Sequence, residues 1–158
     1  MKKFILFFML AVSLGTNAQE DGDTLYSRCP VSVTDTSGYN NYFTSHQSAT
    51  VKVERINKNL VITIQQRDQF FTLFFRQKKL TERKYSIVQG ADDKDELDAK
   101  YSFRSGGRAS YINATSGTVD VSFNEDKGLW ELKINGLLKN LIERTIAVYK
   151  VKGEISIR

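Results

Sequence analysis

The stretch FFTLFFR, residues 70–76, is the most apolar run of the chain beyond its first twenty residues. A β-strand shows alternate side chains to opposite faces of its sheet. Phe71, Leu73 and Phe75 would therefore lie on one face, and Phe70 and Phe74 on the other. Both faces of such a strand must be covered, so the second face meets protein, a bound apolar ligand or a membrane.

The rest of the chain repeats with a period of two, which indicates β-strands rather than helices. We expect strands over residues 50–55, 60–66, 70–76, 84–90, 99–105, 118–124, 129–135 and 144–158. Polar turns separate them, among them EDKG at 125–128, and the single proline leaves these strands uninterrupted. The segment DDKDELDAKY at 92–101 is too poor in apolar residues for a helix and is interpreted as a loop or one short turn. The pattern predicts an all-β chain, either a single antiparallel β-sandwich or a lipocalin-like β-barrel.

The N-terminus, MKKFILFFMLAVSLGTNAQE, has the features of a secretory signal peptide. Two lysines precede a short apolar stretch, and small residues precede a cleavage point after Ala18. The apolar stretch is shorter than the roughly 20 residues of a membrane-spanning helix. We therefore expect a signal peptide over 1–18, a flexible N-terminus over 19–30 and one β domain over 31–158. The protein would be exported to the periplasm, the cell surface or the medium.

The charge balance argues against nucleic acid as a partner. The chain carries 23 Lys and Arg against 18 Asp and Glu, a formal net charge of +5. Loss of Lys2 and Lys3 with the signal peptide would leave 21 against 18, or +3. Nucleic-acid-binding domains concentrate basic charge on one face. The densest basic cluster, RQKKLTERK at 76–84, is interpreted as a solvated loop, with contact to an anionic surface as the alternative.

Three short motifs in the second half carry a resemblance. RKYSIVQG (83–90), AKYSF (99–103) and SGTVDVSF (116–123), in this order, resemble the C-terminal half of small exported domains of unknown function from Bacteroidetes. The similarity covers roughly residues 57–158. It implies a β-sandwich or lipocalin-like barrel, and it implies no catalytic residues.

The chain offers little for catalysis. Nucleophilic catalysis by Ser or Cys usually requires a base, most often His. The only cysteine, Cys29, and the only histidine, His46, form a conceivable pair, but neither lies in a known nucleophile motif. We therefore expect no enzyme and no cofactor. We expect Cys29 to be buried, so that the protein is a monomer, with a dimer linked through Cys29 as the alternative.

Two local motifs suggest weaker sites. The carboxylates of Asp93, Asp95 and Asp98 could ligate Ca²⁺, although the segment lacks the glycine and terminal glutamate of an EF-hand loop. A solvated acidic loop is the preferred interpretation. DTL at 23–25 resembles the short acceptor sequence for O-glycosylation in Bacteroidetes, which implies modification at Thr24.

The function prediction follows from what covers the apolar strand at 70–76. Short strands argue against a small outer-membrane barrel, whose strands need about 9–11 residues. Trp130 shares a face with Leu132 and Ile134, so the core is favoured over a sugar-stacking role. We therefore expect a non-catalytic exported domain that acts through its surface. The alternative is a lipocalin-like carrier whose apolar cavity is lined by Phe71, Leu73, Phe75 and Trp130, and whose partner is a small apolar ligand.

Overall fold

The computed structural model describes residues 23–25, 29–36, 38, 40–45, 49–140 and 147–158. The strands are β1 (Asp23–Leu25), β2 (Val31–Asp35), β3 (Asn41–Thr44), β4 (Thr50–Ile56), β5 (Asn59–Gln66), β6 (Gln69–Phe75), β7 (Arg83–Ile87), β8 (Glu96–Ser105), β9 (Arg108–Asn124), β10 (Leu129–Asn140) and β11 (Ala147–Ile157). These residues contain strands and turns only, so the all-β prediction is confirmed. Among them, no helix is long and apolar enough to cross a membrane.

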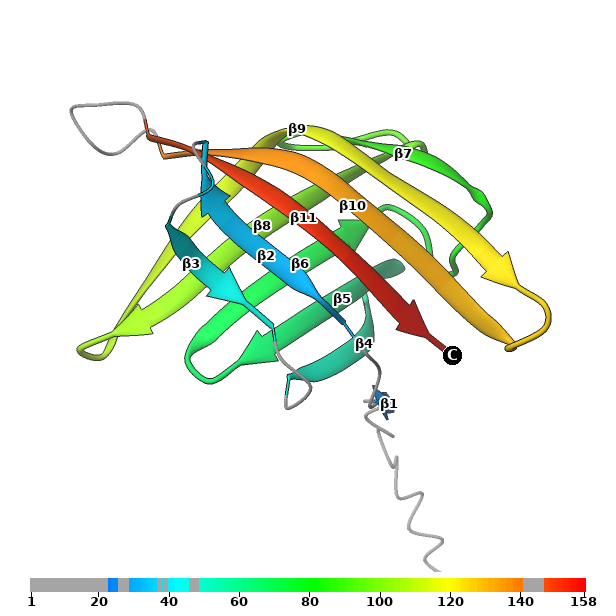
Figure 1. Cartoon of the computed structure of the whole chain (residues 1–158). Helices are drawn as coiled ribbons and strands as arrows, with labels where there is room; N and C mark the ends of the chain where they lie inside the picture. Colours follow the sequence, from blue (N-terminus) through cyan, green and yellow to red (C-terminus); the bar gives the residue numbers. More distant parts are fainter. Residues whose placement is uncertain (1–22, 26–28, 37, 39, 46–48, 141–146) are drawn as a thin grey trace, which may run out of the picture.

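All eleven strands of the described chain belong to one sheet, in the order β1-β4-β5-β6-β8-β7-β9-β10-β11-β2-β3. Neighbouring strands are antiparallel, except that β7 and β8 run parallel over two pairs of residues. Figure 1 shows that the sheet curls, so that β2, β3 and β11 lie across from β5, β6 and β8. Ring contact between Phe43 of β3 and Tyr101 of β8, with centroids 5.8 Å apart, joins the two halves directly.

The inner face of the curl holds the core. In β6, Phe71, Leu73 and Phe75 have no exposed surface, as the alternation of the strand predicts. They pair across the sheet with Ile64, Ile62 and Leu60 of β5 and with Tyr101, Ala99 and Leu97 of β8. The opposite half supplies further buried side chains, including Val33, Leu132, Val151 and Ile155. One curled sheet therefore provides both layers around its own core.

The outer face of β6 is covered by basic side chains of β8. The Lys100 ammonium lies 5.0 Å from the ring centroid of Phe74, and the Arg104 guanidinium lies 5.6 Å from that of Phe70. Long basic side chains can lay their methylene stems on apolar surface and keep the charge in water. Between the two rings, Thr72 is 7% exposed and its hydroxyl lies 3.4 Å from that of Thr63. The chain itself thus covers the second face of FFTLFFR.

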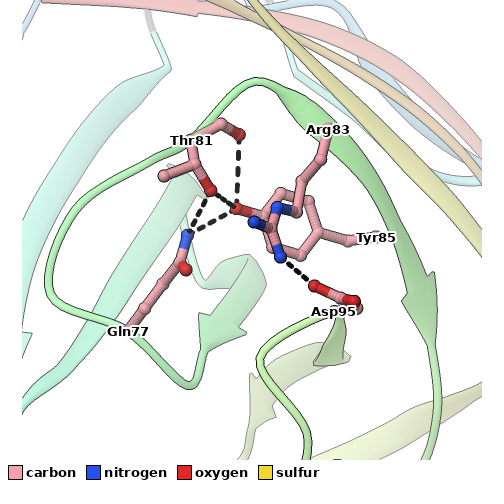
Figure 2. Close-up of polar contacts among 5 residues, drawn as sticks. All are labelled: Gln77, Thr81, Arg83, Tyr85 and Asp95. Carbon is pink, nitrogen blue, oxygen red and sulfur yellow. Dashed lines mark hydrogen bonds and ion pairs between the residues drawn. The ribbon is translucent and has the colours of Figure 1, made fainter.

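One end of the curl, where β6 ends at Phe75, is sealed by the loop over residues 76–82. Leu80 of this loop is 8% exposed and belongs to the core cluster. Tyr85 is completely buried, and its ring packs edge-on against Phe75 at 5.1 Å. Its hydroxyl lies 2.8 Å from the Thr81 hydroxyl and accepts a hydrogen bond from the Gln77 side chain (Figure 2). We call this the closed end, since buried apolar and hydrogen-bonded polar groups fill it.

Some strands were not predicted from the sequence pattern. β2 and β3 lie within residues that showed no sustained alternation, and β1 lies inside the segment 19–30 expected to be a flexible N-terminus. β9 begins at Arg108, ten residues before the expected strand. This early start was not predicted, because Ala109, Ser110 and Tyr111 are exposed and carry no burial pattern. β8 begins at Glu96, so residues 96–101 of the segment 92–101, which was expected to be a loop or short turn, belong to a strand.

We predict different costs for truncating the two faces of β6. Phe71→Ala should lower the free energy of unfolding by about 3–5 kcal/mol, because it opens a cavity in a closed core. Phe70→Ala should cost only about 1–2 kcal/mol, because its ring loses partial burial and one cation–π contact. Denaturant unfolding of both variants measures the difference. Equal losses would mean that the inner face of β6 is not the centre of the core.

Candidate functional site

The core is incompletely filled at the end where β6 begins. The inward positions of β6 are Gln69, Phe71, Leu73 and Phe75, so the apolar series ends in an amide. Gln69 lies opposite Phe103 of β8. Here the structure leaves a cavity of about 340 Å³. The cavity, which we call the aromatic cleft, is lined by Val33, Tyr42, Gln69, Tyr101, Phe103, Ile112 and Tyr149.

A β-bulge brings Tyr42 into the aromatic cleft. Val33 pairs with Phe43 and Thr34 pairs with Asn41, so Tyr42 is the extra residue of β3. Such an extra residue interrupts the alternation of the strand and redirects a side chain. The Tyr42 ring packs edge-on against Tyr149 of β11, with centroids 4.8 Å apart and planes at 81°. Tyr42 nevertheless keeps 43% of its surface exposed, so it stands at the mouth of the cleft.

Tyr101 forms the inner wall and ties it to β3. Its ring contacts Phe43 at 5.8 Å and Phe103 at 5.7 Å, and its hydroxyl donates a hydrogen bond to the Tyr42 carbonyl at 3.3 Å. Burial raises the pKa of the Tyr101 phenol above its ordinary value, and the nearby Tyr149 phenol adds to the shift. The neutral hydroxyl is therefore the form that the fold accommodates.

A wider groove of about 620 Å³ leads into the aromatic cleft. We call it the outer groove. It is lined by Asn41, Tyr42, Phe43, Thr44, Gln66, Arg67, Asp68, Gln69, Phe103, Arg104 and Ser105. Tyr42, Gln69 and Phe103 line both spaces, so these three residues form the boundary between them. A hydrogen bond of 2.9 Å from the Arg104 amide to the Asp68 carbonyl joins the β5–β6 turn to the end of β8 and fixes the far wall.

The cleft is lined by aromatic, aliphatic and amide side chains. Of the seven lining residues, four are aromatic, two are aliphatic and one is an amide. None of the seven is a carboxylate, imidazole, thiol or amine, the groups that most often transfer protons or attack substrates. Aromatic walls with a few polar groups are typical of small-molecule sites, whose volumes run from about 300 to 1,000 Å³.

The residues that the sequence suggested for an apolar cavity lie elsewhere. Phe71, Leu73 and Phe75 have no exposed surface and line neither the aromatic cleft nor the outer groove. Trp130 is partly buried, lies opposite Ile157 and contacts the Phe123 ring at 5.1 Å. Phe71, Leu73 and Phe75 share the inward face of β6 with Gln69, and Gln69 lines the aromatic cleft.

Two of the three suggested calcium ligands contact basic residues or backbone through their carboxylates, and the third, Asp93, accepts a hydrogen bond from the Glu96 amide at its backbone carbonyl. Asp98 lies 3.3 Å from the Arg76 guanidinium and accepts a hydrogen bond of 2.6 Å from the Gly90 amide. Asp95 pairs with Arg83 (Figure 2). Within the described residues, no group of three His, Cys, Asp or Glu side chains could hold a metal ion. The acidic segment 92–101 and the basic segment 76–84 are thus joined by two ion pairs at the closed end.

The described residues among the remaining suggestions are Cys29 and Thr24, in the N-terminal part of the chain. Cys29 is buried, with 3% of its surface exposed, beside the core cluster. His46 lies outside the described residues, so its distance from Cys29 is not defined. Thr24 lies in β1, opposite Lys52 of β4.

Sequence reasoning missed the aromatic cleft because its walls come from distant strands. Tyr101 lies in phase with buried Ala99, and Tyr149 lies in phase with buried Val151. Each is a tyrosine on an inward face, where a purely apolar residue would otherwise fill the core. Together with Gln69, these two tyrosines are polar or amphipathic residues at inward positions, and this is the feature of the sequence from which the cleft could have been predicted.

No protein family model matches this chain, and neither a curated protein nor a solved structure is significantly similar to it.

The raised pKa of Tyr101 predicts a pH effect on stability. A phenol titrates near pH 10 in the unfolded chain and higher in the fold, so its contribution is complete below pH 10. It should be lost as the pH rises through the raised value. Tyr101→Phe should therefore flatten the loss of stability above about pH 10, and cost about 0.5–1.5 kcal/mol at pH 7.

Denaturant unfolding at pH 8 to pH 11.5 measures this effect. Tyr111→Phe is the matched control, because Tyr111 is 59% exposed and should leave the slope unchanged. The same alkaline slope in wild type and Tyr101→Phe would contradict a buried, neutral Tyr101.

Proposed function

We propose that this chain is an exported, non-catalytic binding domain that accepts a small, mainly apolar, ring-sized group in the aromatic cleft. The single observation that carries the proposal is the cavity of about 340 Å³ at the unfilled end of an otherwise closed core. The cleft opens into the outer groove and has the volume of small-molecule sites, which run from about 300 to 1,000 Å³.

The walls of the cleft suit an aromatic ligand. Tyr42 and Tyr149 already pack edge to face at 4.8 Å, and Phe103 lies at the mouth. A ring bound beside them makes further edge-to-face or offset contacts, which are worth about 0.5–1.5 kcal/mol each beyond the burial of its area. Burial of the ring itself adds about 1.5–3 kcal/mol.

The polar groups of the cleft favour a ligand with one hydroxyl or amide. The Gln69 amide both donates and accepts hydrogen bonds, and the tyrosine hydroxyls do the same. These groups orient a ligand without charging the site. The absence of carboxylates, imidazoles, thiols and amines among the seven lining residues supports binding rather than catalysis.

The proposal interprets the curled sheet as an incompletely closed, lipocalin-like barrel. In the described chain, β1 and β3 are the two ends of the strand order, so the sheet is not closed by hydrogen bonds between them. Access to the interior of an eight-stranded barrel is normally from its mouth. In this protein the outer groove beside β3 provides the access to the interior.

We predict saturable binding of p-cresol, a phenol small enough for the cleft. Ile112→Trp should weaken this binding about tenfold or more, a loss of about 1.4 kcal/mol, because the larger side chain occupies the cleft. Ile56→Trp is the matched control, since Ile56 is 48% exposed on β4 and should bind p-cresol as the wild type does. NMR titration of the labelled protein measures both affinity and location.

Shifts confined to Tyr42, Tyr101 and Ile112 would support the site. Binding that survives Ile112→Trp unchanged, or shifts around Trp130 instead, would contradict it. Tyr42→Ala is a second variant that opens the mouth without crowding the core. It should also weaken binding, by about threefold, through loss of one aromatic contact.

The proposal of export rests on the first eighteen residues and on the resemblance to exported domains. The protein purified from its own cells should begin at Gln19, and intact-mass measurement with N-terminal sequencing tests this. Ala18→Arg is expected to block cleavage, because signal cleavage needs a small residue at that position. Retention of residues 1–18 in the wild-type protein would contradict the export proposal and leave the cleft unaffected.

A further inference from the structure

We propose that the group bound in the aromatic cleft is a side chain of an extended peptide, which adds as a strand to the unpaired edge of β3. This inference rests on the proposed function and names its ligand class. A partner's backbone would pair with β3 in the outer groove, and one apolar side chain would enter the aromatic cleft as an anchor.

The edge of β3 can accept a further strand. β3 is the last strand in the order of the described sheet and pairs only with β2. Ser45 donates to the Val31 carbonyl at 2.9 Å, which makes Ser45 and Val31 a hydrogen-bonded pair. In an antiparallel ladder such pairs alternate with residues whose backbone groups point away from the partner. Thr44, the neighbour of Ser45, therefore turns its amide and carbonyl toward the open edge.

All four residues of β3 line the outer groove. Its walls are β3 residues 41–44 on one side and the β5–β6 turn with the end of β8 on the other. Edge strands are normally protected by lysine, proline or a covering loop. β3 is short and bulged, but its sequence, NYFT, contains neither lysine nor proline. The edge thus offers only a few backbone hydrogen bonds, and most of the affinity must come from a side chain in the aromatic cleft.

Strand addition would use both the open edge of β3 and the aromatic cleft. In this mode the main chain gives general affinity, and pockets for alternate side chains give specificity. Tyr42, Gln69 and Phe103 separate the outer groove from the aromatic cleft, so a side chain leaving a strand in the groove passes between them. The cleft of about 340 Å³ has room for an aromatic or a large aliphatic side chain.

The charged residues of the outer groove indicate which type of peptide residue lies next to the anchor. The outer groove is lined by Arg67 and Arg104 against one acidic residue, Asp68. Arg67 lies two residues before Gln69 of the cleft, whereas the Arg104 guanidinium lies over the Phe70 ring on the outer face of β6. Two positions along a strand span about 7 Å. We therefore infer an acidic residue within two positions of the anchor.

The test uses the blocked heptapeptide Thr-Asp-Thr-Phe-Thr-Asp-Thr, which presents the anchor and acid in either strand direction. Replacement of its Phe by Ala should weaken binding about tenfold or more. Replacement of both Asp by Asn should weaken it about threefold at low salt. Methylation of the backbone nitrogens, with every side chain retained, should weaken it about fivefold or more, because it removes the main-chain donors.

Protein variants address the same edge. Thr44→Pro removes the outward amide but keeps the pairing with β2, and proline is tolerated on edge strands. It should weaken peptide binding about fivefold or more and leave p-cresol binding unchanged. Thr44→Ala is the matched control and should change peptide binding less than about twofold, because it keeps the amide.

The outcomes separate the two proposals. Peptide binding that needs the anchor, the peptide amides and the Thr44 amide supports strand addition. Binding of p-cresol without peptide binding, or peptide binding unchanged by backbone methylation, overturns strand addition and leaves the cleft as a small-molecule site. Failure of both p-cresol and peptide to bind overturns both proposals. If Thr44→Pro does not fold, backbone methylation of the peptide decides the question with the wild-type protein.

Discussion

The inner face of β6 is the constraint on which this structure depends. Phe71, Leu73 and Phe75 have no exposed surface, although they belong to a single sheet without a helix or second sheet among the described residues to cover it. The sheet therefore curls until its own other half, with Val33, Val151 and Ile155, meets them. Removing these large apolar side chains from water is the dominant favourable term in such a fold.

The same constraint makes the two ends of the curl different. At the closed end the loop over 76–82 inserts Leu80, and Gln77 and Thr81 satisfy the buried Tyr85 hydroxyl. At the other end the apolar series of β6 gives way to Gln69, and a bulge in β3 turns Tyr42 into the gap. The proposed binding site lies at this end, beside β3, which in the described sheet pairs with β2 on one edge only.

The sequence predicted the parts of this fold that alternate strongly. The strands from β4 to β7, β8 from Ala99 onward and the second half of β9 have apolar residues at every second position, because one side of each faces the core. β2, β3 and the exposed start of β9 have few such residues, and β2 also pairs with a strand more than 100 residues away, where Lys152 lies opposite Ser32. The aromatic cleft needs side chains from six strands, and a local pattern cannot show which of them meet. The basic and acidic segments were each visible, but their pairing, Arg76 with Asp98 and Arg83 with Asp95, depends on the fold.

The central claim is that the aromatic cleft is a binding site and not a packing defect. A crystal of the protein soaked with 4-bromophenol tests it most directly, since anomalous scattering locates the bromine without reference to the protein. The account predicts one strong peak between Tyr42, Tyr101 and Tyr149, with the rings keeping their present arrangement. A cleft closed by these side chains, or bromine found only at other places on the molecule, would contradict it.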